Sequence, residues 1–364
     1  MDTQTMLHQI IRSDIQEMTA YSVADAPSSC IKLDAMEMPY RYPEELKARL
    51  GRLLAEAPEN LYPNPAASGL QEALRQAFGI SDKADIALGN GSDELIQLLT
   101  LLVAKPGAKV LALEPSFVMY RHNAKLFGLE YIGVPLNEDF TMNLPAVLSA
   151  IETHQPALVF VAYPNNPTGV CFKREEVQAL VDAAPGIIVV DEAYGAFSGD
   201  SFLPQAGSRS HLVVMRTLSK IGFAGLRIGY AAGHSLVMRE LAKIVPPYNM
   251  NQLSLAAAKF ALQNRAWIDR HIDILKQERS RLSEAFSDLG MKVFSSEANF
   301  ITVKVNDAVK VFETLRQNNI LIKKLHGTHP LLEQCLRITV GTPEQNDAVL
   351  NVLKNITTSI LKPN

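Results

Sequence analysis

Between residues 68 and 235, short apolar runs alternate with amphipathic stretches, and this alternation constrains the fold more than any other feature of the chain. Short apolar strands separated by helices predict a mostly parallel sheet that helices cover on both faces. Ligands of such open α/β sheets bind beyond the carboxyl ends of the strands, so residues at those ends are the first candidates for a site. The expected strands are 86–88, 110–113, 131–134, 157–162, 187–190, 212–215 and 228–232, and the expected helices include 93–103 and 174–183.

The rest of the chain predicts a smaller α+β unit and an N-terminal arm. Residues 253–289 form a long helical region, followed by expected strands at 300–305, 320–322 and 336–340 and helices at 308–317 and from Pro343. The 364 residues are about twice the length of a typical domain. We therefore expect an arm (1–45) that contributes to the small domain, a large α/β domain (46–265) and a small C-terminal α+β domain (266–364).

The composition argues against several classes of protein. The net charge is −3 and both signs are interspersed, which argues against a nucleic-acid-binding surface. Cys30, Cys171 and Cys335 are too far apart for a disulfide framework or a zinc site, so we expect no metal. No apolar run is long enough to cross a membrane, and the first residues lack the features of a signal peptide, so we expect a cytoplasmic protein.

The first motif, Gly89-Asn90-Gly91-Ser92-Asp93-Glu94, follows an expected strand and opens an expected helix. Glycines allow the backbone to turn tightly, and the free N–H groups at a helix start form an anion site. The motif is therefore a candidate phosphate site. The alternative is an ordinary helix start with Ser92 or Asp93 as the N-cap.

Two further motifs also stand at strand ends. Tyr163-Pro164-Asn165-Asn166-Pro167-Thr168-Gly169 is a rigid turn that can present an asparagine amide to a ligand, or merely join a strand to a helix. Asp191-Glu192-Ala193-Tyr194 follows the apolar run 187–190, and a carboxylate there is costly unless it is paired. Asp191 is therefore either a helix N-cap or the partner of a protonated ring nitrogen.

The fourth motif, Thr217-Leu218-Ser219-Lys220, places a lysine at a strand end among small and apolar residues. Most lysines in such loops are solvated surface residues. Burial lowers the pKa of a lysine and makes its amine nucleophilic enough for imine chemistry. Ser219 and the following Arg227 can hold an anion nearby, with the arginine as a bidentate donor.

Taken in this order, the motifs resemble those of the fold-type I pyridoxal-phosphate enzymes of the aspartate aminotransferase superfamily. Over nearly the whole chain, the closest resemblance is to the histidinol-phosphate aminotransferases. The resemblance implies that pyridoxal 5'-phosphate is carried as a Schiff base on Lys220 and that Asp191 pairs with its pyridinium nitrogen. It also implies that Asn166 and Tyr194 hydrogen-bond the phenolic oxygen of the ring. The implied catalytic residues are Lys220, Asp191 and Tyr194.

The same resemblance assigns the remaining contacts to the cofactor. Phe117, where the family often has tyrosine, takes the place of the aromatic residue that stacks on the ring. Tyr62 matches a tyrosine that one subunit donates to the phosphate in its neighbour, which implies a homodimer with shared active sites to which the arm also contributes. The implied phosphate contacts within one chain are Gly91, Ser92, Asp93, Ser219 and Arg227.

The implied reaction is transamination between L-histidinol phosphate and 2-oxoglutarate, which gives imidazole-acetol phosphate and L-glutamate with ping-pong kinetics. Arg337 matches the arginine that binds the substrate carboxylate or phosphate, and a structural ion pair is the alternative. Tyr21 and Lys323 match the N-terminal tyrosine and the second basic residue that, in the family, bind this anionic group together with the arginine. Lys323 stands where many members have arginine, and Met38 where they usually have asparagine. Both departures bear on the substrate and not on the cofactor. At position 323, a lysine replaces bidentate recognition of a phosphate by a point charge.

Three alternatives remain open at this point. Related members act on aromatic amino acids, so an aromatic aminotransferase is the first. The second is decarboxylation of an amino-acid phosphate on the same scaffold, because substrate orientation on the cofactor selects the bond that breaks. The third is a regulator that keeps the fold for ligand sensing. The presence of both Lys220 and Asp191 and the lack of an added DNA-binding region argue against the third.

Overall fold

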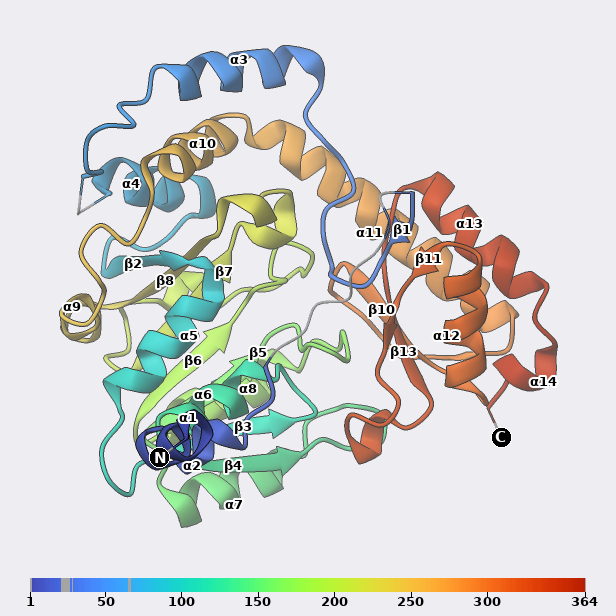
Figure 1. Ribbon diagram of the computed structural model, residues 1–364, viewed down its shortest axis with the longest axis horizontal. Coiled ribbons are helices and arrows are strands. Elements are labelled where there is room, and N and C mark those ends of the chain that lie inside the picture. The colour runs from blue at the N-terminus through green and yellow to red at the C-terminus, as the bar shows by residue number, and fades with distance from the viewer. Residues whose placement is uncertain (1, 21–26, 28, 65–66, 364) are drawn as a thin grey trace.

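The computed structural model describes residues 2–20, 27, 29–64 and 67–363, which form a large lobe and a smaller lobe linked by the long helix α11 (Arg265–Asp288) (Figure 1). A seven-stranded sheet fills the large lobe, in the order β2-β8-β7-β6-β5-β3-β4. Strand β8 is antiparallel to both of its neighbours, and the other pairs are parallel. The strands are β2 (Ala84–Asn90), β3 (Lys109–Glu114), β4 (Glu130–Pro135), β5 (Leu158–Ala162), β6 (Ile187–Asp191), β7 (Leu212–Thr217) and β8 (Ile228–His234).

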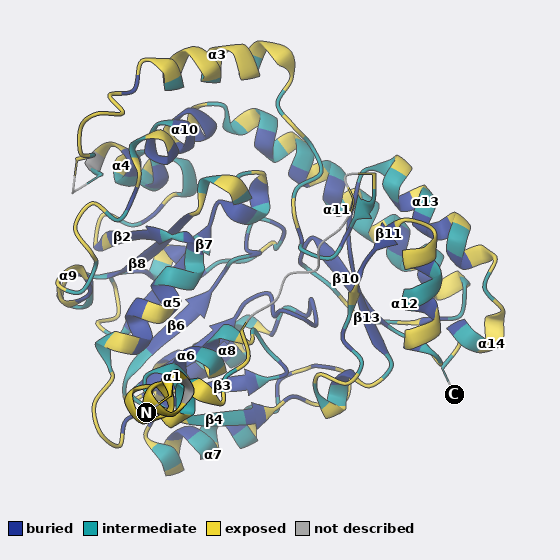
Figure 2. Cartoon of the chain, in the orientation of Figure 1, coloured by how far each residue is buried: buried dark blue, intermediate teal, exposed yellow. Residues whose placement is uncertain are grey.

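Both faces of this sheet are buried, because its strands are apolar at successive positions and successive side chains point to opposite faces. In β3, Leu111 and Leu113 belong to one apolar cluster, whereas Val110 and Ala112 belong to the other. The strands accordingly form the buried centre of the large lobe (Figure 2). The expected α/β class with a mostly parallel sheet is confirmed.

Helices cover the two faces by packing their apolar sides on these clusters. Helices α5 (Gly91–Leu102), α6 (Met119–Leu126) and α9 (Ser235–Ala242) pack on one face. Helices α4 (Ser68–Phe78), α7 (Leu144–His154), α8 (Arg174–Ala183) and α10 (Gln252–Gln263) pack on the other. Helix α3 (Glu44–Ala55) has no buried residue and lies along the outside of the large lobe (Figure 2).

The small lobe holds an antiparallel sheet in the order β12-β13-β10-β9. The N-terminal segment joins this lobe, because β1 (Ile31–Lys32) pairs in parallel with β11 (Ile320–Leu321). The other elements of the small lobe are β9 (Lys292–Val293), β10 (Phe300–Lys304), α12 (Ala308–Gln317), β12 (Lys323–Lys324), β13 (Cys335–Thr339), α13 (Pro343–Lys354) and α14 (Thr358–Leu361). The chain begins with α1 (Thr3–Ile10) and α2 (Ser13–Gln16), and the short 3₁₀ turns are η1 (Leu203–Gln205), η2 (Ser219–Ile221), η3 (Ala224–Leu226) and η4 (Pro330–Leu332).

The expected elements agree with the observed ones except at their ends. The helices expected at 174–183 and 308–317 have those bounds, whereas several strands extend one or two residues beyond their apolar runs. The helical region 253–289 consists of two helices, α10 and α11, because Asn264 interrupts the helix between them. Among the described residues, none of the helices combines the length and the apolar character needed to cross a bilayer.

Candidate active site

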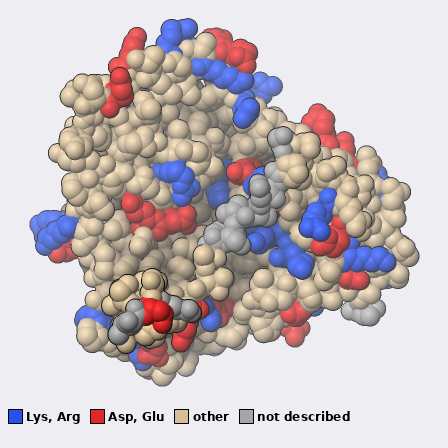
Figure 3. Space-filling view, viewed as in Figure 1, with Lys and Arg blue, Asp and Glu red and all other residues tan. Residues whose placement is uncertain are grey.

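The motifs meet at one edge of the large sheet. Strand β2 is antiparallel to β8 and β8 is antiparallel to β7, so β2 points the same way as the parallel strands. Their ends border a pocket of about 240 Å³ that also faces the small lobe. Side chains of both charge signs line the hollow between the lobes (Figure 3). The predicted residues that line the pocket are Ser92, Asp93, Phe117, Asn166, Asp191, Tyr194, Ser219, Lys220, Arg227, Lys323 and Arg337.

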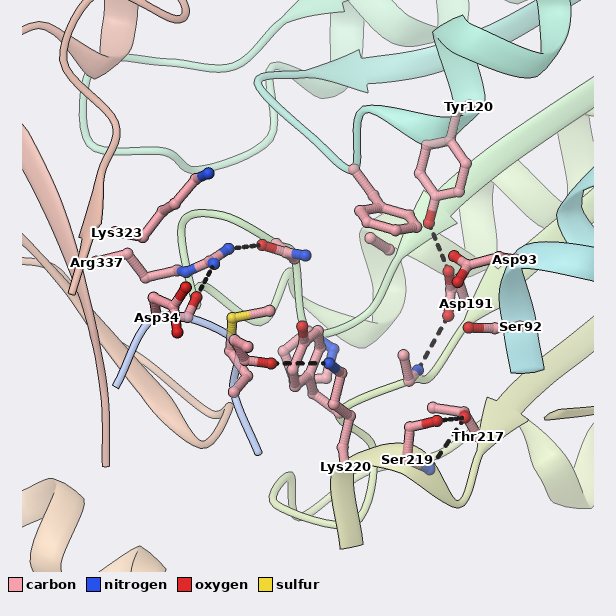
Figure 4. Close-up of a pocket in the computed structure, with 18 of the residues that line it drawn as sticks. Asp34, Ser92, Asp93, Tyr120, Asp191, Thr217, Ser219, Lys220, Lys323 and Arg337 are labelled. Atoms are coloured by element: carbon pink, nitrogen blue, oxygen red, sulfur yellow. Dashed lines mark hydrogen bonds between the residues drawn. The ribbon is translucent and has the colours of Figure 1, made fainter. Parts of the chain in front are cut away.

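Lys220 lies on η2, directly after β7, and its side chain enters the pocket between the two lobes (Figure 4). Its Nζ donates a hydrogen bond to the carbonyl oxygen of Ala35 (3.3 Å) and lies 5.7 Å from the ring centroid of Tyr194. Burial lowers the pKa of the Lys220 ammonium to about 8, and the positive charge of Arg337 acts in the same direction. A substantial fraction of the amine is therefore neutral near physiological pH, as the sequence interpretation requires.

Asp191 is the last residue of β6 and is only 4% exposed. Its Oδ1 accepts a hydrogen bond from the backbone N–H of Ala193 (3.0 Å), and its Oδ2 accepts one from the hydroxyl of Tyr120 (2.7 Å). Burial raises the pKa of the Asp191 carboxyl to about 6 and outweighs these two hydrogen bonds, which lower it. The residue is part of a strand, so its interpretation as a helix N-cap is wrong.

A cradle suited to an anion is formed by the start of α5 and by Arg227. Gly91 begins the helix at φ +78°, and a Cβ there would lie 2.4 Å from Arg227 Nη2. A Cβ on Gly229 would lie 2.5 Å from the backbone nitrogen of Ser92. The two glycines therefore let β8, Arg227 and the helix start approach one another. The N-cap of α5 is Asn90, so the alternative with Ser92 or Asp93 in that position is wrong.

Arg227 is held in this cradle by groups from both sides. Its Nη2 forms an ion pair with Asp93 Oδ2 (3.2 Å), and its Nη1 donates to Ser219 Oγ (3.5 Å). The hydroxyl of Thr217 in turn donates to Ser219 Oγ (2.9 Å). Asp93 can therefore offer an anion only its backbone N–H, whereas its carboxylate orients Arg227.

Two cations from the small lobe form the opposite wall of the pocket (Figure 4). Lys323 and Arg337 are directly opposite each other in the antiparallel pair β12–β13, so their side chains lie on the same face. Arg337 donates from Nη1 to Asn166 Oδ1 (2.6 Å) and from Nη2 to the carbonyl oxygen of Asp34 (2.9 Å). Because the amide oxygen of Asn166 is thus occupied, its NH₂ group is the one that can serve a ligand in the pocket.

Of the predicted residues that the structure describes, Gly91 and Tyr62 are not among those that line the pocket. Tyr62 is 80% exposed and stacks on Tyr248 with 4.5 Å between ring centroids, away from the pocket lining of its own chain. Tyr21 lies outside the described residues.

Sequence reasoning missed several residues that line the pocket. Tyr120 and Thr217 line it, as do Asp34, Ala35 and Met36 of the N-terminal segment. The spacing offered no signal for Tyr120, because Phe117 lies before α6, which begins at Met119, and the helical i,i+3 rule does not apply to the pair. The motifs offered no signal for residues 34–36, since the pairing of β1 with β11 places them there.

The residues of this pocket fit pyridoxal 5'-phosphate. The cradle with its two crowded glycines suits a phosphate, and the oriented carboxylate of Asp191 suits a basic ring nitrogen. The amine of Lys220 suits an aldehyde, and the aromatic side chain of Phe117 suits the face of a flat ring.

Comparison with known proteins agrees with the fit of the pocket to pyridoxal 5'-phosphate. The family model for aminotransferases of class I and II matches residues 28–353. A histidinol-phosphate aminotransferase of Neisseria meningitidis serogroup C is 63% identical over 357 residues, which cover 96% of this chain and 97% of the relative. One from Chromobacterium violaceum is 53% identical and covers 96% of this chain and 98% of its own. The crystal structure of histidinol-phosphate aminotransferase from Sinorhizobium meliloti in complex with pyridoxal-5'-phosphate shares the fold, with a TM-score of 0.84 at 24% identity, over 96% of this chain and 98% of that one.

Proposed function

The chain belongs to the class I and II aminotransferases, and within them to the histidinol-phosphate aminotransferases, and from this premise we propose that it transfers an amino group between L-histidinol phosphate and 2-oxoglutarate. The products are imidazole-acetol phosphate and L-glutamate. The observation that carries the proposal is the placement of Lys220, with its lowered pKa, opposite the cationic wall of Arg337 and Lys323 in one pocket.

Pyridoxal 5'-phosphate, when bound, supplies an electron sink for the electrons that leave the substrate Cα. Lys220 would hold it covalently, and Asp191 would face its ring nitrogen. Phe117 would stack on the ring, and the NH₂ of Asn166 and the hydroxyl of Tyr194 would donate to its phenolic oxygen. Gly91, Ser92, Asp93, Ser219 and Arg227 would bind the phosphate, the first three through the start of α5.

Lys220 moves the proton in this proposal. Once the substrate's amino group has displaced it from the cofactor, the free amine of Lys220, with a pKa of about 8, can accept a proton from the substrate Cα and donate it to C4′ of the cofactor at neutral pH. The nearby positive charge of Arg337 favours the neutral, basic form. Because the amine lies between the two lobes, it reaches a substrate whose anionic group is bound on the small-lobe side.

Lys323 and Arg337 would bind the phosphate of histidinol phosphate and, in the second half of the cycle, a carboxylate of 2-oxoglutarate. The neighbour of Lys323 provides a matched control, since Lys324 points to the opposite face of β12 with its Nζ 5.7 Å from the Phe312 ring centroid. We expect Lys323→Ala to raise the KM for histidinol phosphate about tenfold, because a charged hydrogen bond is lost. Lys324→Ala should change it less than about twofold.

The experiment that tests the proposal is a product analysis with purified protein, pyridoxal 5'-phosphate, histidinol phosphate and 2-oxoglutarate. We expect stoichiometric glutamate, abolished by Lys220→Ala in a protein that still folds. Phenylalanine as the preferred donor would make the enzyme an aromatic aminotransferase. Release of carbon dioxide without glutamate would contradict transamination.

We also propose that the enzyme is a homodimer and that Tyr62 completes the phosphate site of its partner. Large apolar side chains are exposed near the end of α3, in the loop after it, in the loop before α10 and at the start of α10: Leu53, Leu61, Tyr62, Tyr248 and Leu253. Mixing Tyr62→Phe subunits with Lys220→Ala subunits would then give hybrids with one complete site. Activity above that of Tyr62→Phe alone is expected, and light scattering should give the mass of a dimer. A monomer, or no gain on mixing, would contradict shared sites.

A further inference from the structure

Tyr120 lines the pocket beside Asp191. The side chain is fully buried, and its ring stacks on Phe160 with 4.4 Å between centroids and 3° between planes. The edge of Phe117 packs against the same ring at 5.8 Å and 85°. The hydroxyl donates to Asp191 Oδ2 at 2.7 Å (Figure 4). With its ring fixed on two sides, Tyr120 holds this donor in one place.

The two oxygens of Asp191 each accept a hydrogen bond from a fixed neutral donor, the Tyr120 hydroxyl and the Ala193 N–H. Together they fix the plane of the carboxylate. Burial raises the pKa of this carboxyl to about 6, which opposes the ionised form that a protonated ring nitrogen needs. The hydrogen bond from Tyr120 is the largest influence that lowers the pKa again, because it stabilises the anion.

A hydroxyl is suited to this position because it carries no charge. A lysine or arginine at the same distance would also keep Asp191 ionised, but its positive charge would repel a protonated ring nitrogen. Tyr120 stabilises the anion and leaves its charge available to a cationic ligand.

We propose that Tyr120 is a positioning residue that keeps Asp191 ionised and aimed at the ring nitrogen of the cofactor. The inference rests on the proposed function, because it requires pyridoxal 5'-phosphate to bind beside Asp191. It assigns one function to the segment 117–120: Phe117 stacks on the ring, and Tyr120, three residues later, sets the charge of the group at its edge.

The test compares Tyr120→Phe with Tyr163→Phe. Tyr163 is a matched control, because it is also buried and its hydroxyl donates to Asp200 Oδ2 at 2.8 Å, outside the pocket lining. Both variants lose one tyrosine–carboxylate hydrogen bond, so both should lower the unfolding temperature. Only Tyr120→Phe should weaken binding of pyridoxal 5'-phosphate to the cofactor-free protein, by about tenfold in equilibrium dialysis.

Two further readouts separate this role from a purely structural one. Without the Tyr120 hydroxyl, Asp191 stabilises a protonated ring nitrogen less, so the ring is less positive. The nitrogen that joins the cofactor to Lys220 then holds its proton more strongly. In Tyr120→Phe, the pH midpoint at which the visible absorbance of the bound cofactor changes should therefore rise by about half a pH unit or more. In a protein that already carries Asp191→Asn, adding Tyr120→Phe should leave the Kd of the cofactor within about twofold, because Tyr120 acts through that carboxylate.

The outcomes distinguish the inference from the proposed function. Wild-type protein that fails to bind pyridoxal 5'-phosphate would overturn the proposed function itself. Wild type that binds, with Tyr120→Phe showing the same Kd and the same pH midpoint, would overturn only the role of Tyr120. If Tyr120→Phe weakened cofactor binding as much in the Asp191→Asn background as in wild type, that result would also overturn the role of Tyr120.

Discussion

Two carboxylates stand side by side at the end of β6, and their surroundings differ. Glu192 points to one face of the sheet, where its Oε2 lies 2.7 Å from Arg216 Nη2 and accepts from Ser201 Oγ at 2.8 Å. Asp191 points to the other face and accepts from the Tyr120 hydroxyl and the Ala193 N–H. Within the part of the chain that the structure describes, no lysine or arginine lies within ion-pair distance of Asp191.

This difference separates a structural carboxylate from one kept for a ligand. A buried charge is tolerated when a fixed cation and further hydrogen bonds compensate it, as Arg216 and Ser201 do for Glu192. Asp191 has neutral donors only, and its raised pKa reports the burial that remains uncompensated. A cationic ring nitrogen would supply the missing charge. The pocket therefore favours binding of a ring that carries a protonated nitrogen.

The largest expected effect is on catalysis by Asp191→Asn. Replacing the carboxylate removes the charge that faces the ring nitrogen, so kcat/KM should fall by about 10²–10³. The free energy of unfolding of the cofactor-free protein should stay the same or rise, because an uncompensated buried charge is gone. Steady-state kinetics and urea denaturation measure the two quantities. Lost stability together with unchanged kcat/KM would reverse the assignment of the two carboxylates.

Glu192→Gln should show the opposite pattern. It leaves the guanidinium of Arg216 buried without its anion, so the free energy of unfolding should fall by about 3 kcal/mol. Activity per cofactor-loaded site should stay within about threefold of wild type, because Glu192 does not line the pocket. Urea denaturation measures the free energy of unfolding, and kinetics normalised to bound cofactor measure the activity per site. A stable but inactive Glu192→Gln protein would contradict the structural role of Glu192.

A smaller effect is the pH dependence of stability. The pKa of Asp191 is raised to about 6 in the folded protein, so the folded state holds this proton more strongly than the unfolded state does. Its contribution to stability is therefore present at low pH and is lost as the pH rises through about 6. Relative to Asp191→Asn, cofactor-free wild type should lose about 1 kcal/mol between about pH 5 and pH 7. A flat difference, or one of opposite sign, would mean that Asp191 stays ionised in the empty site.

The sequence predicts the sheet and most of the pocket because both depend on local patterns. Apolar runs mark strands that are buried on both faces. Polar motifs that follow such runs meet at one edge of the sheet, independently of the conformation of the connecting loops. Lys220, Asp191 and Asn166 are found in this way, and their roles remain proposals. The division of the chain at residues 45 and 265 and a cytoplasmic location also stay predictions.

The residues that were missed depend on tertiary packing. Tyr120 reaches Asp191 only because α6 places its ring on Phe160 of β5, a contact between distant parts of the chain. The carbonyl groups of Asp34 and Ala35 reach Arg337 and Lys220 because β1 adds to β11 of the small lobe. Neither contact leaves a periodic signal, since both involve a backbone group or a single hydroxyl.

The most direct test of this account is to locate the cofactor. The protein loaded with pyridoxal 5'-phosphate would be reduced with borohydride, digested with trypsin and mapped by mass spectrometry. We expect the added mass on a peptide spanning residues 217–227, because trypsin cuts after Arg216 and Arg227 but not after a modified Lys220. Unmodified Lys220, with the cofactor on another lysine or on none, would contradict it.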